Sequence, residues 1–378
     1  MESFSKNNYD GKGETDLEVL IRTDASFEIG TGHVMRCLTL ANILSEYGAA
    51  VSFICRELPG NMCCFIENKG YIVYRLKQNK REEIEQITPH SHWLTVNWET
   101  DVLETIHLLK SQNKFDWLII DHYALDEKWE TKIKPFTKKI MVIDDLADRR
   151  HECDILLDQN YYFNKEFRYE SLVPKHCKRY LGPEYTLLRH EFIMQDRKIH
   201  SGSIKRLLIY FGGTDSTNET KKAIESLLLL KKNDIKVDVI VGKNNRFYKD
   251  IQTLCKQYSF LNYHLNVSNM ANLVNAADLA IGACGTTTWE RLYLGLPTIV
   301  VSVAENQKLI AETLGEINVI KYLGTNDSVK KKDIALALKN FVQNPAILIE
   351  MSESCLKIMG EHELLQKSLI NEIINGVE

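Results

Sequence analysis

One histidine follows a glycine loop that joins an apolar segment to an amphipathic one. Gly30 and Gly32 precede His33, and glycines let the chain turn sharply and let a ligand come close. Residues 17–21 are mostly apolar and predict a buried strand, and the helical spacing of apolar side chains predicts a helix over 33–47. In the first turn of that helix the dipole disfavours imidazolium, so a neutral ring could act as a base. A histidine that only caps or packs is the alternative.

Two more glycine loops follow apolar segments in the second half of the chain. Residues 212–213 follow a predicted strand at 205–211, and residues 282–285 follow one at 278–281. Strand–glycine–helix junctions bind phosphates, so three such loops favour phosphate or nucleotide binding. The first loop is not a dinucleotide fingerprint, because Met35 stands where the third glycine would be.

The loop at 282–285 leads into residues that could hold a diphosphate without lysines. Gly285 and the threonines 286–288 would present N–H groups and hydroxyls at a helix start. Glu290, about one turn further on, could accept hydrogen bonds from a ribose diol. The alternative is an ordinary turn with threonine caps.

Polar residues also follow other predicted strands, at the sheet edge where open α/β proteins bind ligands. Asp121, His122 and Tyr123 come after one strand, residues 144–145 (two aspartates) after another, and residues 305–307 after a third. The two aspartates could suggest a metal pair, but no third ligand accompanies them and turn capping is equally compatible. Each of these residues also has a structural alternative. His122 could be a structural histidine, Tyr123 an aromatic side chain at the rim of the site, and residues 305–307 a simple helix N-cap.

The composition of the chain argues against several classes of protein. The chain has 378 residues, 44% hydrophobic and 26% charged, with a net charge of -4 and no large basic block, which argues against nucleic-acid or anionic-membrane binding. Its nine cysteines form no C-x-x-C pair, which is typical of a reducing compartment. Neither a signal peptide nor an apolar run of about 20 residues is evident. We therefore expect a cytoplasmic protein.

Short apolar runs alternate with amphipathic segments, which predicts parallel strands joined by crossover helices. We expect a flexible tail over 1–16, a first Rossmann-like domain over 17–196 and a second over 204–378, with the final helix a candidate to return to the first. Expected strands lie at 18–23, 50–55, 71–75, 116–120, 139–143, 154–157, 205–211, 236–241, 262–265, 278–281 and 297–302. Expected helices lie at 33–47, 60–69, 99–112, 218–232, 245–257, 286–294 and 305–313, with helical residues to the end. The two sheets would face each other across a ligand cleft.

Taken in order, these segments resemble one family: the hydrolase of pseudaminic acid biosynthesis that removes UDP from UDP-2,4-diacetamido-2,4,6-trideoxy-β-L-altropyranose. The resemblance covers roughly residues 18–310. The matching pieces are 22–41, 121–126, 143–148, 156–160, 181–189, 211–215, 288–291 and 304–307.

The resemblance implies a GT-B fold of two Rossmann-like domains and an inverting, metal-independent hydrolysis without a cofactor. It implies that His33 is the general base and that Tyr123 and Asn306 position the sugar or water. It also implies that the loop from Cys284 to Thr288 holds the diphosphate, with Glu290 at the ribose. The substrate-binding residues expected on this basis are Gly30, Gly32, Arg36, Gly213, Cys284, Gly285, Thr286, Thr287, Glu290 and Gln307.

One departure from the family pattern stands in the diphosphate loop. Cys284 and the threonines 286–288 replace an expected glycine- or serine-rich sequence, which keeps backbone donors but changes side-chain contacts. The expected partners are a UDP-linked diacetamido sugar and water, and we expect a monomer. The alternatives are a glycosyltransferase that uses a UDP-amino sugar donor, a UDP-sugar epimerase, and a UDP-sugar-binding protein without activity.

Overall fold

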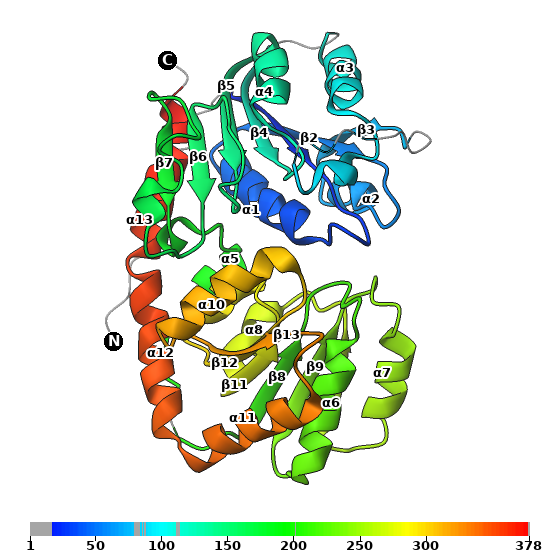
Figure 1. The fold of residues 1–378 in the computed structure, drawn as a ribbon, viewed down its shortest axis with the longest axis vertical. Coiled ribbons are helices and arrows are strands. Elements are labelled where there is room, and N and C mark those ends of the chain that lie inside the picture. The colour runs from blue at the N-terminus through cyan, green and yellow to red at the C-terminus, as the bar shows by residue number, and fades with distance from the viewer. Residues whose placement is uncertain are drawn as a thin grey trace, which may run out of the picture.

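The structure is a computed structural model that describes residues 17–376 apart from 79–83, 85, 87, 111–113 and 201. The expected tail at 1–16 lies outside the described residues. Within them the chain forms two parallel sheets, one of seven strands and one of six, stacked along the long axis of the molecule (Figure 1). Helices cover both sheets, and the carboxyl ends of several strands point toward the junction of the two halves.

The first sheet has the strand order β3-β2-β1-β4-β5-β6-β7. β1 and β4 are neighbours in this sheet although they are distant in sequence, and Thr23 pairs with Asp121 at their carboxyl ends. The strands are β1 (Glu18–Thr23), β2 (Ala50–Arg56), β3 (Ile72–Leu76), β4 (Phe115–Asp121), β5 (Thr137–Ile143), β6 (Ile155–Asp158) and β7 (Lys178–Leu181).

The second sheet has the order β10-β9-β8-β11-β12-β13. Its first strand along the chain, β8, lies inside the sheet, as β1 does in the first sheet. The order in which strands are added therefore reverses at β1 and at β8, and ligands bind at such points in open α/β sheets. The strands are β8 (Arg206–Tyr210), β9 (Lys236–Val241), β10 (Leu261–Leu265), β11 (Leu279–Gly282), β12 (Thr298–Ser302) and β13 (Lys321–Thr325).

The helices connect successive strands and close the chain. They are α1 (Gly32–Glu46), α2 (Cys63–Glu67), α3 (Trp98–Leu109), α4 (Glu127–Ile133), α5 (His190–Ile193), α6 (Glu219–Leu230), α7 (Tyr248–Cys255), α8 (Met270–Ala276), α9 (Thr287–Tyr293), α10 (Lys308–Glu316), α11 (Lys331–Gln343), α12 (Ala346–Met359) and α13 (His362–Asn375).

The predicted α/β class with two parallel-sheet domains is confirmed. The sequence did not predict β7, β13, α4, α5 or α8. β7 has only four residues and begins with exposed Lys178 and Arg179, and β13 contains Gly324, so neither has the apolar run of a buried strand. α4 is seven residues long, and Asp126 caps it by accepting from the N–H groups of Lys128 and Trp129.

The two halves have separate hydrophobic cores, and the chain passes between them twice. Leu187 packs in the first core and Leu188 in the second, ahead of the expected boundary at residue 196. At the other end α12 lies along the second half, and α13 lies beside β6 and β7 of the first (Figure 1). There Ile373 joins the first core, and its carbonyl accepts from Trp117 Nε1 at 2.8 Å.

Arg197 connects the two segments in which the chain passes between the halves. Its guanidinium donates to the carbonyl oxygens of Leu356 and Gly360 at the end of α12, and to that of Tyr293 at the end of α9. Gly360 has a φ of 46°, which glycine adopts most readily. The junction therefore has a defined bend between α12 and α13.

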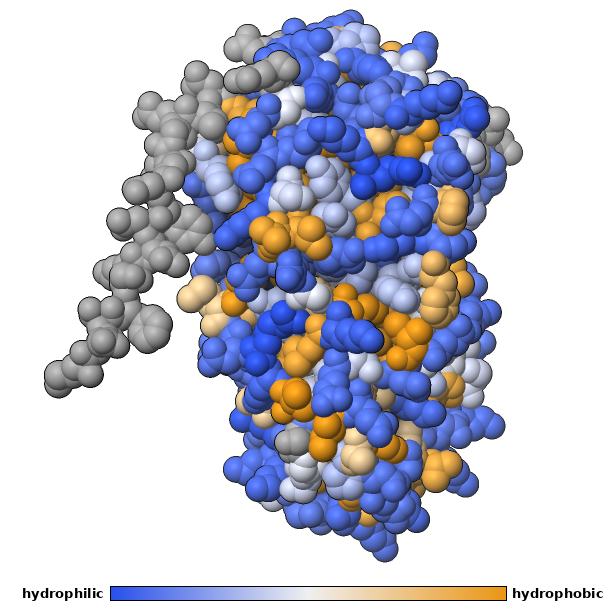
Figure 2. Space-filling view, turned by 90° about the vertical axis from the view of Figure 1, so that its left-hand side faces the viewer, coloured by the Kyte–Doolittle hydropathy of each residue, from blue (hydrophilic) through white to orange (hydrophobic). Residues whose placement is uncertain are grey.

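The face that carries the end of the chain is mostly hydrophilic, with apolar residues in small separate groups (Figure 2). Scattered exposed apolar side chains are ordinary for globular proteins. Across the part of the chain that the structure describes, no helix combines the length and apolar character needed to cross a bilayer. The expected monomer stays a prediction.

Candidate active site

His33 lies in the first turn of α1, as predicted, and its side chain is held by a carboxylate of β4. Its Nδ1 lies 2.6 Å from Asp121 Oδ1. Asp121 ends β4 and is completely buried, whereas His33 is 8% exposed. A buried acid that holds one ring nitrogen fixes the orientation of the imidazole and leaves the other nitrogen for chemistry.

Electrostatics fix the tautomer of this pair. Burial by itself would raise the pKa of Asp121, but Arg36 and His33 outweigh it and hold the pKa far below its usual range. An ionised Asp121 can only accept hydrogen bonds. His33 therefore donates from Nδ1, and in the neutral ring Nε2 carries the free lone pair. None of the described residues has a recorded hydrogen bond to Nε2, so a neutral His33 can accept a proton there.

Arg36, one turn further along α1, links two carboxylates. Its Nε and one terminal nitrogen donate to the two oxygens of Asp121 at 2.6 and 2.7 Å. Its other terminal nitrogen donates to Asp145 Oδ2 at 2.6 Å. Residues three apart share one face of a helix, so α1 presents His33 and Arg36 to Asp121 together. Arg36 was expected to bind substrate, yet its guanidinium is occupied by these two carboxylates.

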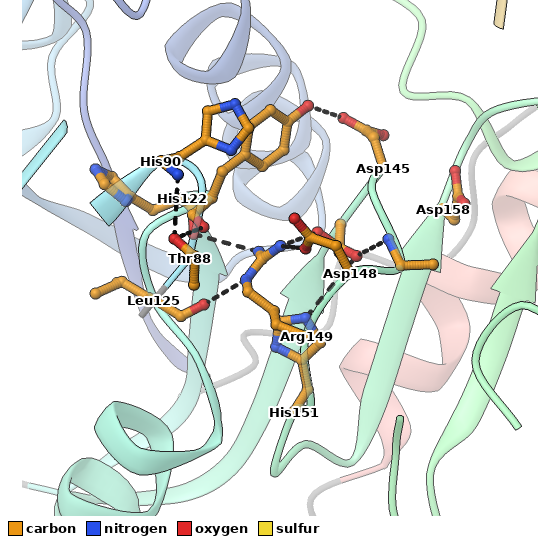
Figure 3. Close-up of polar contacts among 12 residues, drawn as sticks. Thr88, His90, His122, Leu125, Asp145, Asp148, Arg149, His151 and Asp158 are labelled. Atoms are coloured by element: carbon orange, nitrogen blue, oxygen red, sulfur yellow. Dashed lines mark hydrogen bonds and ion pairs between the residues drawn. The ribbon is translucent and has the colours of Figure 1, made fainter. Parts of the chain in front are cut away.

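Tyr123 forms an aromatic side of the site. Its hydroxyl donates to Asp145 Oδ2 at 2.5 Å, the contact drawn at Asp145 in Figure 3. Its ring meets that of His33 edge-on, with centroids 4.5 Å apart, and stacks on Trp93 at 5.5 Å. Burial, followed by Asp145, raises the pKa of Tyr123 well above its ordinary value, so the hydroxyl stays a donor. In this structure the tyrosine hydroxyl bonds Asp145.

The neighbouring Asp144 belongs to a second, deeper network. Arg149 Nη1 pairs with its Oδ1 at 2.8 Å and with Asp148 at 2.9 Å, and the Arg149 Nε donates to the carbonyl of Leu125 (Figure 3). Tyr169 donates to the Asp144 carboxylate at 3.1 Å. Asp144 therefore pairs with Arg149, whereas Asp145 pairs with Arg36. The described residues contain no cluster of three His, Cys, Asp or Glu side chains suited to a metal ion.

The glycine loops of the two halves approach each other directly. A Cβ atom at Gly32 would lie 3.0 Å from Thr286 Oγ1, and a Cβ atom at Gly213 would lie 3.1 Å from Thr31 Oγ1. The helix start that carries His33 therefore faces two loops of the second half. Gly30, with a φ of 81°, makes the turn that a side-chain-bearing residue would adopt at a cost.

Glu290 carries an ion pair that the sequence did not predict. Arg189 donates to its two carboxylate oxygens at 2.6 and 3.0 Å. This bidentate contact holds the carboxylate in one orientation, and Glu290 stays 6% exposed. Each of its oxygens keeps a lone pair for another donor.

The remaining expected residues follow the carboxyl ends of the neighbouring strands β11 and β12. Cys284 is buried behind the loop, while Gly285, Thr286 and Thr287 are partly exposed. Gln307 accepts from the N–H of Val303 at 3.2 Å and would lie 3.7 Å from a Cβ atom at Gly285. Asn306 is exposed. Their contacts with a substrate stay predictions.

Sequence reasoning missed the partners that hold these side chains. Asp121 was noted at a strand end but not as the partner of His33, and Asp145 was not linked to Arg36. No pattern pointed to Trp93, and Arg189 closed the matching segment 181–189 without an expected role. Each of these contacts joins segments far apart in the chain, so only the order of strands in the sheets brings them together.

Two parallel-sheet domains that meet at glycine loops define a protein of the GT-B class. Comparison with known proteins agrees with this class. Residues 207–366 match the glycosyltransferase family 28 C-terminal domain. The fold resembles the crystal structure of Acinetobacter baumannii MurG, with a TM-score of 0.63 and 14% identity over 95% of this chain and 99% of that one.

Sequence relatives narrow the class to a family. The chain is 31% identical to the UDP-2,4-diacetamido-2,4,6-trideoxy-β-L-altropyranose hydrolase of Campylobacter jejuni, over 79% of this chain and 97% of that protein. It is 28% identical to an uncharacterized protein of Methanocaldococcus jannaschii over 77% of this chain, and the match spans 57% of that longer protein. The chain belongs to the family of UDP-2,4-diacetamido-2,4,6-trideoxy-β-L-altropyranose hydrolases.

Proposed function

We propose that this chain hydrolyses UDP-2,4-diacetamido-2,4,6-trideoxy-β-L-altropyranose to UDP and the free sugar, a step of pseudaminic acid biosynthesis. The observation that carries the proposal is the His33–Asp121 pair, 2.6 Å apart, in the first turn of a helix that faces the glycine loops of the other domain. Family membership supplies the substrate.

In the proposed reaction a water molecule attacks the anomeric carbon from the face opposite the diphosphate. Its proton goes to Nε2 of His33 as the new C–O bond forms. The bond between the anomeric carbon and the phosphate oxygen breaks, and UDP leaves with the electron pair. The sugar is released with inverted configuration. A positioned base is typically worth about 10²- to 10⁴-fold.

Asp121 supports the base in this scheme. Its negative charge stabilises the imidazolium that forms when His33 takes the proton, and its hydrogen bond keeps Nδ1 protonated beforehand. Arg36 holds Asp121 ionised and in place. The base therefore works with a fixed tautomer.

In this scheme the second domain binds the leaving group, UDP. Backbone N–H groups and hydroxyls of the loop from Cys284 to Thr288 would bind the diphosphate and stabilise the charge that develops on it. Glu290, held by Arg189, would accept from the ribose hydroxyls. UDP is a good leaving group, so the scheme includes no general acid and no metal ion.

The sugar would lie between His33 and the start of α10. Asp145 Oδ1 is a buried acceptor for which no donor is recorded among the described residues, and it could accept from a sugar hydroxyl or an acetamido N–H. The rings of Tyr123 and Trp93 would pack against the apolar side of the sugar. Asn306 is exposed and could position the sugar or the water.

A glycosyltransferase is the second candidate, because the family 28 domain and the MurG fold occur in that class. Incubation of the protein with the UDP-sugar, without acceptor and with excess EDTA, separates the two. Proton and phosphorus NMR should record UDP and free sugar in equal amounts. UDP release only after an acceptor is added would favour a transferase, and EDTA inhibition would contradict the metal-independent scheme.

A further inference from the structure

Arg291 is a buried arginine without a carboxylate partner. It follows Glu290 in α9, its exposed fraction is 2%, and no ion pair to it is recorded among the described residues. Its Nε has no hydrogen-bond acceptor among them. Burying an unpaired charge costs several kcal/mol, so buried arginines are ordinarily paired.

The guanidinium lies directly beneath the loop assigned to the diphosphate. One terminal nitrogen donates to the carbonyl of Ala283, just before that loop, at 2.6 Å and to Oγ1 of Thr288, its last residue, at 3.1 Å. Space for the group comes from Gly282, where a Cβ atom would overlap Arg291 Nη1. The arginine therefore fixes the loop and leaves a positive charge behind it.

None of the described carboxylates forms an ion pair with Arg291, although the charge of Glu290 favours its cationic form. Glu290 is the adjacent acid, and it is already paired with Arg189. Burial lowers the pKa of Arg291 to about 10, so the guanidinium is still a cation at neutral pH. In a medium of low dielectric constant, an uncompensated cation acts strongly on an anion bound nearby.

We infer that Arg291 is a positioning residue that orders the loop from Ala283 to Thr288 and supplies the positive charge that attracts the diphosphate of the nucleotide. The inference rests on the nucleotide site of the proposed function and adds the source of its charge. It also explains how a phosphate loop without lysine could bind two phosphates. The instability of the unpaired cation would be offset only when the anion is bound.

The test compares UDP, UMP and uridine binding by calorimetry in the wild type, Arg291→Met and Arg291→Lys. In Arg291→Met we expect UDP affinity to fall by roughly tenfold to a hundredfold, UMP affinity to fall less, and uridine affinity to stay unchanged. Because the variant removes an unpaired buried charge, its melting temperature should stay equal or rise. Arg291→Lys should keep most of the UDP affinity.

Arg206→Met is the matched control, since Arg206 begins β8 and pairs with Asp238 at the opposite end of the strand from the loop. It should leave the three affinities unchanged. An equal loss for UDP and uridine, an Arg291→Met protein that does not fold, or unchanged UDP affinity would overturn the inference. Binding is measured without turnover, so a wild type that binds UDP but does not hydrolyse the sugar nucleotide would contradict the proposed reaction alone.

Discussion

Arg36 and Asp121 make a two-point contact, with the arginine donating to each carboxylate oxygen at 2.6 and 2.7 Å. Asp121 uses one of these same oxygens to bind His33. The arginine therefore keeps Asp121 ionised, and the ionised acid keeps the Nδ1 proton on the imidazole. Through Asp145 the same arginine also reaches Tyr123. This buried chain of charges determines which nitrogen of His33 is free.

His33→Asn removes the base and should lower kcat by about 10²- to 10⁴-fold. UDP affinity should stay close to that of the wild type, because the diphosphate and ribose contacts are assigned to the second domain. Steady-state kinetics and UDP titration measure the two effects. His90→Asn is the control: His90 packs against Tyr123 at 5.4 Å and has no recorded contact with Asp121. Near-wild-type turnover in His33→Asn would remove His33 as the base.

Asp121→Asn keeps the size of the side chain but removes its charge. We expect kcat to fall by up to about 10⁴-fold, because the amide no longer fixes the Nδ1 tautomer or stabilises the imidazolium. Loss of one partner of a buried pair also costs about 3–5 kcal/mol of stability, so activity is compared below the melting temperature of the variant. Asp116→Asn, at the start of β4, is the control. Equal kcat values for both variants would contradict the role of Asp121.

Tyr123→Phe tests whether the hydroxyl acts through Asp145 or on the substrate. The variant keeps the ring against His33 and loses the hydrogen bond to Asp145, which should cost about 1.5–3 kcal/mol of stability. We expect kcat to fall within about tenfold, with KM nearly unchanged. A large rise in KM at constant kcat would instead indicate direct contact between the hydroxyl and the sugar.

Glu290→Gln should weaken UDP binding, because it removes a charged acceptor for the ribose and leaves Arg189 without its bidentate partner. A hydrogen bond to a charged group is worth about 1.5–3 kcal/mol, so the dissociation constant should rise roughly tenfold or more. UMP, which keeps the ribose, should be affected as UDP is. Unchanged affinity for both would move the ribose contact elsewhere.

Stability should fall as pH rises above neutrality because of His151. Burial alone would lower the pKa of His151, but Glu130, 2.7 Å away, and Asp144 outweigh it and raise the pKa to about 9. Its contribution is therefore complete below the unfolded pKa of about 6.5 and is lost as pH rises through 9, a loss of about 3 kcal/mol. Denaturant unfolding at several pH values measures this loss.

His151→Gln isolates that contribution, since the difference from the wild type between pH 6.5 and 9 belongs to His151. Asp158 also lowers the stability of the folded protein as pH rises, but over a lower range of pH. Its pKa is raised to about 8 by burial and by Asp145, so it costs stability from about pH 4 to pH 8. Parallel curves for wild type and His151→Gln above pH 7 would show that His151 is not charged in the folded protein.

The sequence predicts what depends on local spacing. The glycine loop and the helical pattern after it placed His33 in the first turn of α1, and strand ends marked Asp121 and Asp145 as polar residues of one sheet edge. Their pairing depends on β1 and β4 being neighbours, a long-range contact seen in the register of Thr23 and Asp121. The spacing of residues along the chain does not reveal the order of the strands in the sheet.

In the second domain, too, the sequence predicts local features but not contacts between distant segments. Residues 282–285 were recognised as a glycine loop because a buried strand precedes them. The Arg189–Glu290 pair and the buried Arg291 depend on how α9 packs against the rest of the domain, and neither residue type at its position indicates burial. Arginine is ordinarily exposed, so the sequence alone favours a surface side chain at 291.

The central claim is water attack at the anomeric carbon with His33 as base. Its most direct test is hydrolysis of the UDP-sugar in ¹⁸O-water, followed from the first turnovers by proton and phosphorus NMR and mass spectrometry. We expect ¹⁸O on the anomeric carbon of the sugar, none in UDP, and the inverted anomer first. Label in UDP would mean that a P–O bond is cleaved, and that result would contradict the account.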